Sequence, residues 1–192
     1  MKEMRDFFNA RVDRFKVEDE FSDLRDQFVE KLNLKEGSTI VDLGCGEGIM
    51  LKNLLKTNPK TVIEVDVSTD MICENIESHK EIECVSFVCG DFLNICLKEV
   101  DAVMIYNAYP HFLDKKKLSK HLASCLNEHG IVMIAHSKSK EMLNNHHKGQ
   151  DDHLKVSTML KTPLEEYEAF KEEFELEEYY DDSYYFIKLT KR

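Results

Sequence analysis

Five short runs of apolar, mostly β-branched residues alternate along the chain with segments of helical periodicity. A strand that is followed by a helix before the next strand cannot form a hairpin with it, so such strands pair in parallel and the helices cover both faces. The pattern therefore predicts an α/β fold, an open and doubly wound sheet whose strands are mostly parallel. The predicted strands are residues 39–43, 61–67, 84–88, 101–106 and 131–136.

Helices and a C-terminal hairpin are predicted between and after these strands. Apolar residues at intervals of three and four indicate the helices, and Ser68 is a suitable N-cap for one of them. Polar residues 137–152 predict a loop or an irregular helix. Two apolar runs on either side of Asp181-Asp182-Ser183 indicate an antiparallel hairpin at residues 176–180 and 184–189. The predicted helices end near Leu34, Pro59, His79 and Leu126.

A last helix is predicted ahead of the hairpin. Thr162-Pro163-x-Glu165 has the form of a capping box with proline at the first helical position. This helix is expected to bury one apolar face, formed by Leu164, Tyr167, Phe170 and Phe174.

Acidic residues outnumber basic ones, with 37 Asp and Glu against 26 Lys and Arg and a formal net charge of −11. Nucleic acids and anionic membranes are bound through neutralising cations, so this balance disfavours both as partners. No apolar run reaches the ~18–20 residues of a membrane span, and the charged N-terminus does not fit a signal peptide. The six cysteines form no Cys-x-x-Cys pair, which is typical of reduced thiols. A cytoplasmic protein is predicted.

Polar and glycine residues follow three of the predicted strands, where ligands of open α/β sheets bind. They are the turn Val41–Gly48 (VDLGCGEG), the carboxylate Asp66, and the sequence Gly90-Asp91-Phe92. Glycines at a strand-to-helix turn let the backbone approach a ligand closely, and an acid after the second strand can accept ribose hydroxyls. Ile49 stands where a dinucleotide fingerprint needs its third glycine, and the turn has no Walker lysine. The turn therefore suits a nucleoside ligand without a pyrophosphate.

These motifs together resemble those of the class I S-adenosylmethionine-dependent methyltransferases. The resemblance is carried by IVDLGCGEG, EVDVSTDM (Glu64–Met71) and CGDF (Cys89–Phe92), and it runs from about Lys35 to Ala135. Leu126–His136 is similar to the family's turn into the fifth strand, although Asn127-Glu128-His129 departs from it. The resemblance implies a Rossmann-like seven-stranded sheet with an antiparallel C-terminal hairpin, and S-adenosylmethionine as cofactor with S-adenosylhomocysteine as product.

The resemblance also implies the residues that hold the cofactor. The three turn glycines would flank the methionine moiety, Asp66 would hold the ribose, and Asp91 with Phe92 would hold the adenine. Asp42 would order the turn, and Met71 would lie against the adenine face. Two alternatives stay open, since Asp91 could cap a helix and Cys45 could pack as a small apolar residue. The predicted cofactor contacts are Asp42, Gly44, Cys45, Gly46, Gly48, Asp66, Val67, Met71, Gly90, Asp91, Phe92 and Asn107.

The acceptor side carries histidines after the fourth and fifth strands. An imidazole can take a proton from a thiol, hydroxyl or amine near neutral pH, and methyl transfer otherwise needs mainly alignment. His111, His136 and His147 are therefore the candidate catalytic bases. Residues 135–149 also resemble a branch of small bacterial methyltransferases in which His136, Ser137, Asn144 and His147 approach the acceptor. Converging histidines could hold a metal, but no tight spacing favours this, and no metal is predicted.

The region after strand four argues against one substrate class. Tyr106–Pro110 (YNAYP) lacks the Asn/Asp-Pro-Pro-Tyr/Phe motif that resembling enzymes use on adenine or glutamine amides. A small-molecule acceptor with a thiol, hydroxyl or amine is predicted, because the sheet and its helices take up nearly all of the 192 residues and the acidic charge disfavours nucleic acid. A monomer or homodimer is expected. The alternatives are a protein methyltransferase acting on a basic partner and a cofactor-binding module without catalysis.

One domain is predicted for residues 1–192. Residues 1–34 would form an N-terminal helical lid or cap, residues 35–136 the cofactor-binding core, and residues 137–192 the substrate-side segment with the last helix and hairpin. Within the first segment, Arg5–Phe15 could cover the cofactor with Phe7, Phe8 and Phe15, while Asn9 or Arg11 makes a polar contact. The alternative for this segment is a packed surface helix.

Overall fold

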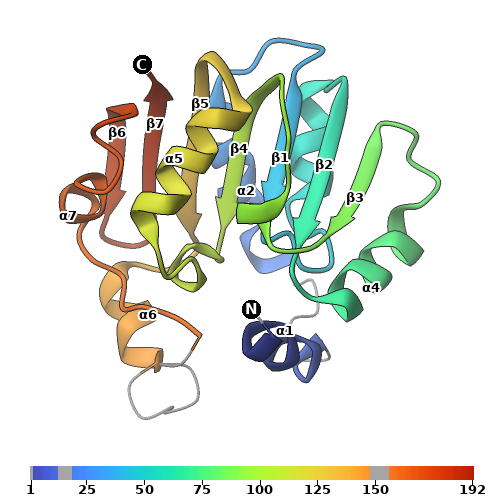
Figure 1. Ribbon diagram of the computed structural model, residues 1–192, viewed down its shortest axis with the longest axis horizontal. Coiled ribbons are helices and arrows are strands. Elements are labelled where there is room, and N and C mark those ends of the chain that lie inside the picture. Colours follow the sequence, from blue (N-terminus) through green and yellow to red (C-terminus); the bar gives the residue numbers. More distant parts are fainter. Residues whose placement is uncertain (1, 13–18, 148–155) are drawn as a thin grey trace.

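A seven-stranded mixed sheet forms the centre of the computed structural model, which describes residues 2–12, 19–147 and 156–192 (Figure 1). The strand order is β3-β2-β1-β4-β5-β7-β6. The first five strands are parallel, and β7 runs antiparallel to both β5 and β6. The predicted α/β sheet with an antiparallel C-terminal hairpin is confirmed. The strands are β1 (Thr39–Leu43), β2 (Thr61–Asp66), β3 (Val85–Cys89), β4 (Val100–Tyr106), β5 (Leu126–His136), β6 (Phe174–Asp181) and β7 (Tyr185–Lys191).

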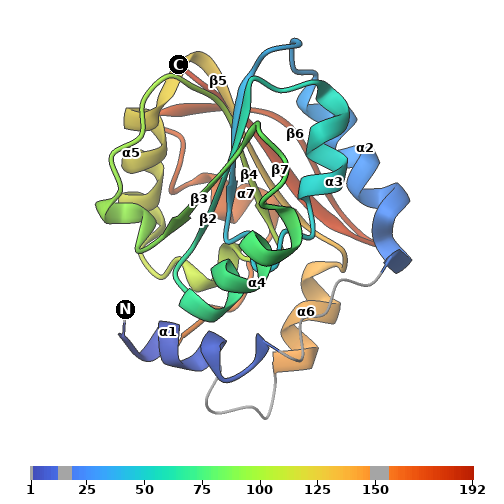
Figure 2. The same cartoon turned by 90° about the vertical axis from the view of Figure 1, so that its right-hand side faces the viewer.

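Helices cover both faces of the sheet, with α5 on one side and α2 and α3 on the other (Figure 2). The helix α1 lies across the end of the sheet, below the carboxyl ends of the parallel strands (Figure 1). The α-helices are α1 (Lys2–Asn9), α2 (Ser22–Leu32), α3 (Leu51–Leu54), α4 (Thr69–His79), α5 (Lys115–Cys125), α6 (Lys140–His147) and α7 (Pro163–Tyr167). Short 3₁₀ turns are η2 (Asp19–Phe21), η3 (Leu55–Thr57), η4 (Phe92–Asn94) and η5 (Tyr109–His111).

The alternation of side chains along each strand divides the core between the two faces. Val41, Val103 and Ile105 face α5, and Ile40 and Met104 face α2 and α3. Because β1 and β4 are buried on both faces, they read as continuous apolar runs and were predictable from sequence. The Ser68 hydroxyl accepts a hydrogen bond from the Met71 N–H, which confirms the predicted N-cap of α4.

Several elements differ from the sequence prediction, and β5 begins at Leu126 and not at residue 131. The capping box starts α7 as predicted, but the helix ends at Tyr167, and Leu164 is 53% exposed. Phe174 begins β6 in register with Lys191 and is buried there, so its apolar character reflects a strand and not the last turn of a helix. Part of the segment predicted as a loop or an irregular helix forms α6. Among the described residues, no helix combines the length and apolar character needed to cross a membrane.

Candidate functional site

A cavity of about 610 Å³ opens at the carboxyl ends of β1, β2, β3 and β4. This volume is in the range of small-molecule sites, ~300–1000 Å³. The cavity brings together all three sequence motifs and one of the candidate bases. Its predicted lining residues are Gly44, Cys45, Gly46, Asp66, Val67, Met71, Gly90, Asp91, Phe92, Asn107 and His111.

The glycine turn after β1 has a backbone that few other residues could adopt. Gly44 has φ +76°, and a Cβ built on it would lie 2.5 Å from the Cβ of Ala108. Gly46 has φ +56° and lies over Met71. The Gly44 and Cys45 N–H groups both donate to the Val65 carbonyl, at 2.7 and 3.2 Å, and this ties the turn to β2. The turn therefore approaches the post-β4 segment more closely than any side chain would allow.

Gly48 has a structural role in this arrangement. It does not line the cavity, and a Cβ built on it would lie 2.5 Å from Oδ1 of Asn75. The third glycine therefore lets α4 pack against the turn. The predicted direct contact of Gly48 with the cofactor is not supported by this placement.

Asp66 ends β2 and fixes the two segments beside it. Its Oδ2 accepts from the Gly46 N–H at 3.0 Å, and its Oδ1 accepts from the Ser68 N–H at 2.8 Å. Burial raises the pKa of the Asp66 carboxyl, although these two backbone donors oppose the shift. The carboxyl therefore has a fixed orientation at the cavity wall.

Replacing Asp66 by alanine should weaken cofactor binding about 10- to 100-fold, since charge-assisted hydrogen bonds contribute ~1.5–3 kcal/mol. The Gly46 N–H would also lose its acceptor, so the turn would be less ordered. Titration calorimetry with S-adenosylmethionine measures the change. The control is Asp70→Ala, an exposed carboxyl in the first turn of α4. Equal affinities for the two variants would refute a ribose-binding role for Asp66.

Gly90, Asp91 and Phe92 follow β3 at the far side of the cavity. The Asp91 carboxyl caps η4 by accepting from the Leu93 N–H at 3.1 Å, so the cap alternative noted from sequence is realised. Phe92 is buried and packs edge-to-face on His121 at 4.8 Å. The cap holds the Asp91 side chain in one orientation while the residue still lines the cavity.

Asp42, near the end of β1, and Cys45, within the turn, are both buried. Asp42 is 1% exposed and does not line the cavity. Burial raises its carboxyl pKa well above the ordinary value, and the neighbouring Glu64 adds to the shift. Burial similarly raises the pKa of the Cys45 thiol, which therefore stays protonated and packs as a small side chain.

On the acceptor side, His111 lies in η5 at the cavity wall. Its Nδ1–H donates to the Val156 carbonyl at 2.9 Å, and Phe8 packs edge-to-face on its ring at 4.8 Å. A neutral imidazole with its proton on Nδ1 carries the lone pair on Nε2. Asn107, with φ +53°, also lines the cavity and accepts from the Ser137 N–H at 3.0 Å.

Two other predicted acceptor residues, His136 and Asn144, do not line the cavity. His136 is 1% exposed and packs against Tyr185 of β7, because the antiparallel hairpin covers the end of β5. Asn144 bonds both the N–H and the carbonyl of Leu160, which joins α6 to the segment before α7. The side chain of His147 lies outside the described residues.

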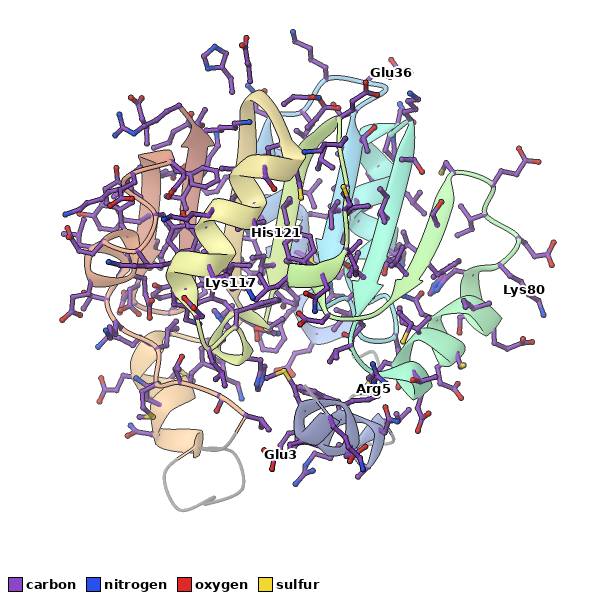
Figure 3. All side chains as sticks on the ribbon, in the orientation of Figure 1. Glu3, Arg5, Glu36, Lys80, Lys117 and His121 are labelled. Carbon is purple, nitrogen blue, oxygen red and sulfur yellow. The ribbon has the colours of Figure 1, made fainter. Side chains whose placement is uncertain are left out.

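The helix α1 closes the cavity opposite the sheet, and Figure 3 shows Glu3 and Arg5 on it. Arg5 donates from Nε to the Val67 carbonyl at 3.1 Å, and Asn9 accepts from the Ser68 hydroxyl at 2.7 Å. Phe8 lines the cavity, while the guanidinium of Arg11 lies over the ring of Phe7 within the same segment. The placement agrees with a lid for the described part of this segment. Phe15 lies outside the described residues.

Several lining residues carry no sequence signal. Residues of these types are common on protein surfaces, and their positions depend on how α1, η5 and α5 approach the sheet. One of them, Lys117 on α5, is labelled in Figure 3. These additional residues are Glu3, Met4, Phe112, Leu113, Asp114, Lys117 and Val156.

The part of the chain that forms most of the cavity matches a known protein family. A family model described as "Methyltransferase domain" matches residues 40–130, which include β1 to β4 and all three motifs. This match and the shared fold support a class I S-adenosylmethionine-dependent methyltransferase. S-adenosylmethionine is the cofactor of these enzymes, and the match covers the three motifs that resemble theirs.

Two curated relatives match parts of the chain. Phosphoethanolamine N-methyltransferase 1 of Zea mays is 30% identical over 112 residues, which are 57% of this chain and 22% of that protein. Ribosomal RNA small subunit methyltransferase A of Persephonella marina is 31% identical over 96 residues, 45% of this chain and 36% of that protein. The chain thus spans about a fifth to a third of the length of these relatives.

Solved structures share the fold over nearly the whole chain. A methyltransferase solved with the Haloferax volcanii Trm112 methyltransferase activator has a TM-score of 0.79 at 18% identity, covering 96% of both chains. The N-methyltransferase NodS of Bradyrhizobium japonicum, in complex with S-adenosyl-L-homocysteine, has a TM-score of 0.75 at 12% identity, covering 98% of both. At these identities the likeness establishes the fold alone.

The residues present fit the family's cofactor. The turn offers a cradle that a Cβ at Gly44 would fill, and the Asp66 carboxyl lines the cavity at the end of β2. Beneath the turn, Oδ2 of Asp42 is buried and has no hydrogen-bond partner among the described residues. A buried carboxylate oxygen left in this state suits a cationic ligand or a bridging water.

Proposed function

We propose that this protein transfers the methyl group of S-adenosylmethionine to a small-molecule acceptor whose nucleophile is a thiol, hydroxyl or amine. The observation that carries the proposal is the cavity of about 610 Å³, which joins the cofactor motifs to His111 and is covered by α1. A covered cavity of this size suits a cofactor and a small acceptor better than a macromolecular surface.

In this proposal the chain's own residues bind and orient the two substrates. The Gly44–Gly46 backbone would hold the methionine moiety, Asp66 the ribose hydroxyls, and Asp91 with Phe92 the adenine. When bound, the cofactor supplies an electrophilic methyl group. His111 would accept the acceptor's proton at Nε2, because its Nδ1–H is committed to the Val156 carbonyl.

Two other acceptor classes, RNA and a protein, fit the structure less well. A ribosomal RNA methyltransferase is among the relatives, but a net charge of −11 opposes binding to RNA phosphates. A neighbouring structure is a complex with an activator protein, and an acidic surface could receive a basic partner. The covered cavity favours the small molecule over both.

The proposal is tested by calorimetric titration with S-adenosylmethionine and S-adenosylhomocysteine, followed by a methyl-transfer screen of thiols, hydroxylated metabolites and amines. We expect micromolar binding of both ligands and transfer to at least one small acceptor. Binding without turnover on any pool, including basic peptides and RNA, would favour a module without catalysis. Folded, ligand-free protein that binds neither compound would refute the proposed cofactor site.

A further inference from the structure

Glu64 is a carboxyl group in the middle of a buried strand. It is 0% exposed and lies in register with Asp42 of the neighbouring strand β1. Asp66 follows two positions later on β2, so all three carboxyl side chains leave the same face of the sheet. This face is the one beneath the glycine turn. The proposed cofactor contacts give Glu64 no role.

Asn75 of α4 connects Glu64 to the turn. Its side-chain Nδ2 donates to Oε2 of Glu64 at 2.8 Å and lies 3.5 Å from the Gly46 carbonyl. Its Oδ1 accepts from Nδ1 of His79 at 2.8 Å, and Asn75 itself is fully buried. Gly46 is therefore held from both sides, by Asp66 at its N–H and by Asn75 at its carbonyl. The Asn75 amide therefore contacts both the Gly46 carbonyl and the Glu64 carboxyl.

The carboxyl pair is incompletely compensated. Neither Oε1 of Glu64 nor Oδ2 of Asp42 has a hydrogen-bond partner among the described residues. Adjacent buried carboxylates without a cation repel each other, so at least one of them holds a proton. The titratable groups facing Glu64 are Asp42 and Cys45 from β1 and the turn, Asp66 from its own strand, and His79 of α4 through Asn75.

We propose that Glu64 positions the cofactor turn through Asn75 and releases a proton to solvent when the cationic methyl donor binds. The inference rests on the proposed function, since it takes S-adenosylmethionine as the ligand above the turn. A cation near a protonated carboxyl in a poorly solvated site favours the ionised form. The proton leaves the carboxyl O–H for bulk water, and the ionised oxygen keeps its hydrogen bond from Asn75.

Burial raises the pKa of the Glu64 carboxyl to about 7, and hydrogen bonds from the Asn75 amide and the Cys45 thiol oppose this shift. If the donor complex requires the ionised form, the dissociation constant for S-adenosylmethionine should be about tenfold larger at pH 6 than at pH 8. Calorimetry at pH 7 in two buffers of different ionisation enthalpy should also detect release of a fraction of a proton.

Glu64→Gln separates the proton from the hydrogen bond. The glutamine carbonyl still accepts from Asn75 but cannot ionise, so affinity at pH 8 should stay within about threefold, while the pH dependence falls below about twofold. Glu64→Ala loses the acceptor, and its affinity should fall about tenfold at every pH. Any proton exchange by the donor's own amino group is common to all variants. Glu74→Gln, an exposed carboxyl on α4, is the matched control and should behave as wild type.

Stability provides a readout without ligand. The native carboxyl keeps its proton up to about pH 7, whereas the unfolded one loses it near its ordinary pKa, ~4.3. The native state therefore loses stability as pH rises between these values. Glu64→Gln should remove this loss, so its Tm should exceed that of wild type at pH 8 and approach it near pH 5.

Two results would overturn the inference. Wild-type protein that binds the donor with heats independent of the buffer releases no proton, and this measurement needs no variant to fold. If Glu64→Gln keeps the full pH dependence of donor binding, a group other than Glu64 releases the proton. The absence of any binding heat, by contrast, would count against the proposed function and leave proton release by Glu64 without its ligand, so the two failures are distinguishable.

Discussion

Gly44→Ala should lower the affinity for S-adenosylmethionine by roughly 100-fold or more. An alanine at φ +76° costs about 1–2 kcal/mol, and its Cβ would lie 2.5 Å from that of Ala108. Relieving such overpacking typically costs about 1–3 kcal/mol more, so the turn or the post-β4 segment must move. Because both segments line the cavity, the movement distorts the proposed cofactor contacts. Calorimetric titration measures the loss.

A matched control separates backbone strain from the clash. Gly37 has φ +81°, and a Cβ there would meet nothing within 4 Å. It follows Glu36, which Figure 3 places at the end of the molecule opposite α1. Gly37→Ala should therefore lower Tm through strain alone and leave donor affinity unchanged. Adding Ala108→Gly to Gly44→Ala removes the struck methyl group and should restore part of the affinity. Wild-type affinity in Gly44→Ala would show that the close approach is dispensable.

The cofactor side was largely predictable because its signals are local. A glycine that must adopt positive φ, an acid at a strand end and an N-cap serine are each constrained within a few residues. Asp66 and Asp91, which the resemblance assigns to the ribose and the adenine, both line the cavity. Asp42 and Gly48 do not line the cavity as predicted and lie behind its wall. Strand pairing and the packing of α4 determine how far each residue lies from the cavity, and sequence spacing does not encode this.

The acceptor side was less predictable because long-range packing decides it. His136 ends strand five, and its ring packs against Tyr185 of β7. No residue near His136 in the sequence predicts this contact. His111 depends on a bond to Val156, 45 residues away. Glu64 could have been noticed from the sequence, because it is a charged residue at a position of β2 that the alternation of side chains places in the core. Such a residue needs a buried partner, and Asn75 supplies it.

His111→Gln should lower kcat about 100-fold or more, while the dissociation constant for S-adenosylmethionine changes less than about twofold. General-base catalysis typically contributes 10²–10⁴-fold, and glutamine can keep a hydrogen bond to the Val156 carbonyl without accepting a proton. The measurement is steady-state methyl transfer with the acceptor found by screening, alongside donor titration. A His111 that acts only in packing would instead change Tm and donor affinity together.

His121→Gln is the matched control for this prediction. His121 also contacts a backbone carbonyl, that of Ile95 at 3.0 Å, and packs edge-to-face on a phenylalanine at 4.8 Å, but it does not line the cavity. Its replacement should affect stability as much as that of His111 and leave kcat unchanged. His136→Gln, at a buried position, should likewise lower Tm and spare kcat. Full turnover in His111→Gln would mean that solvent or the acceptor's own acidity removes the proton. Loss of turnover in His136→Gln at unchanged Tm would indicate that His136, at the end of strand five, is the catalytic base.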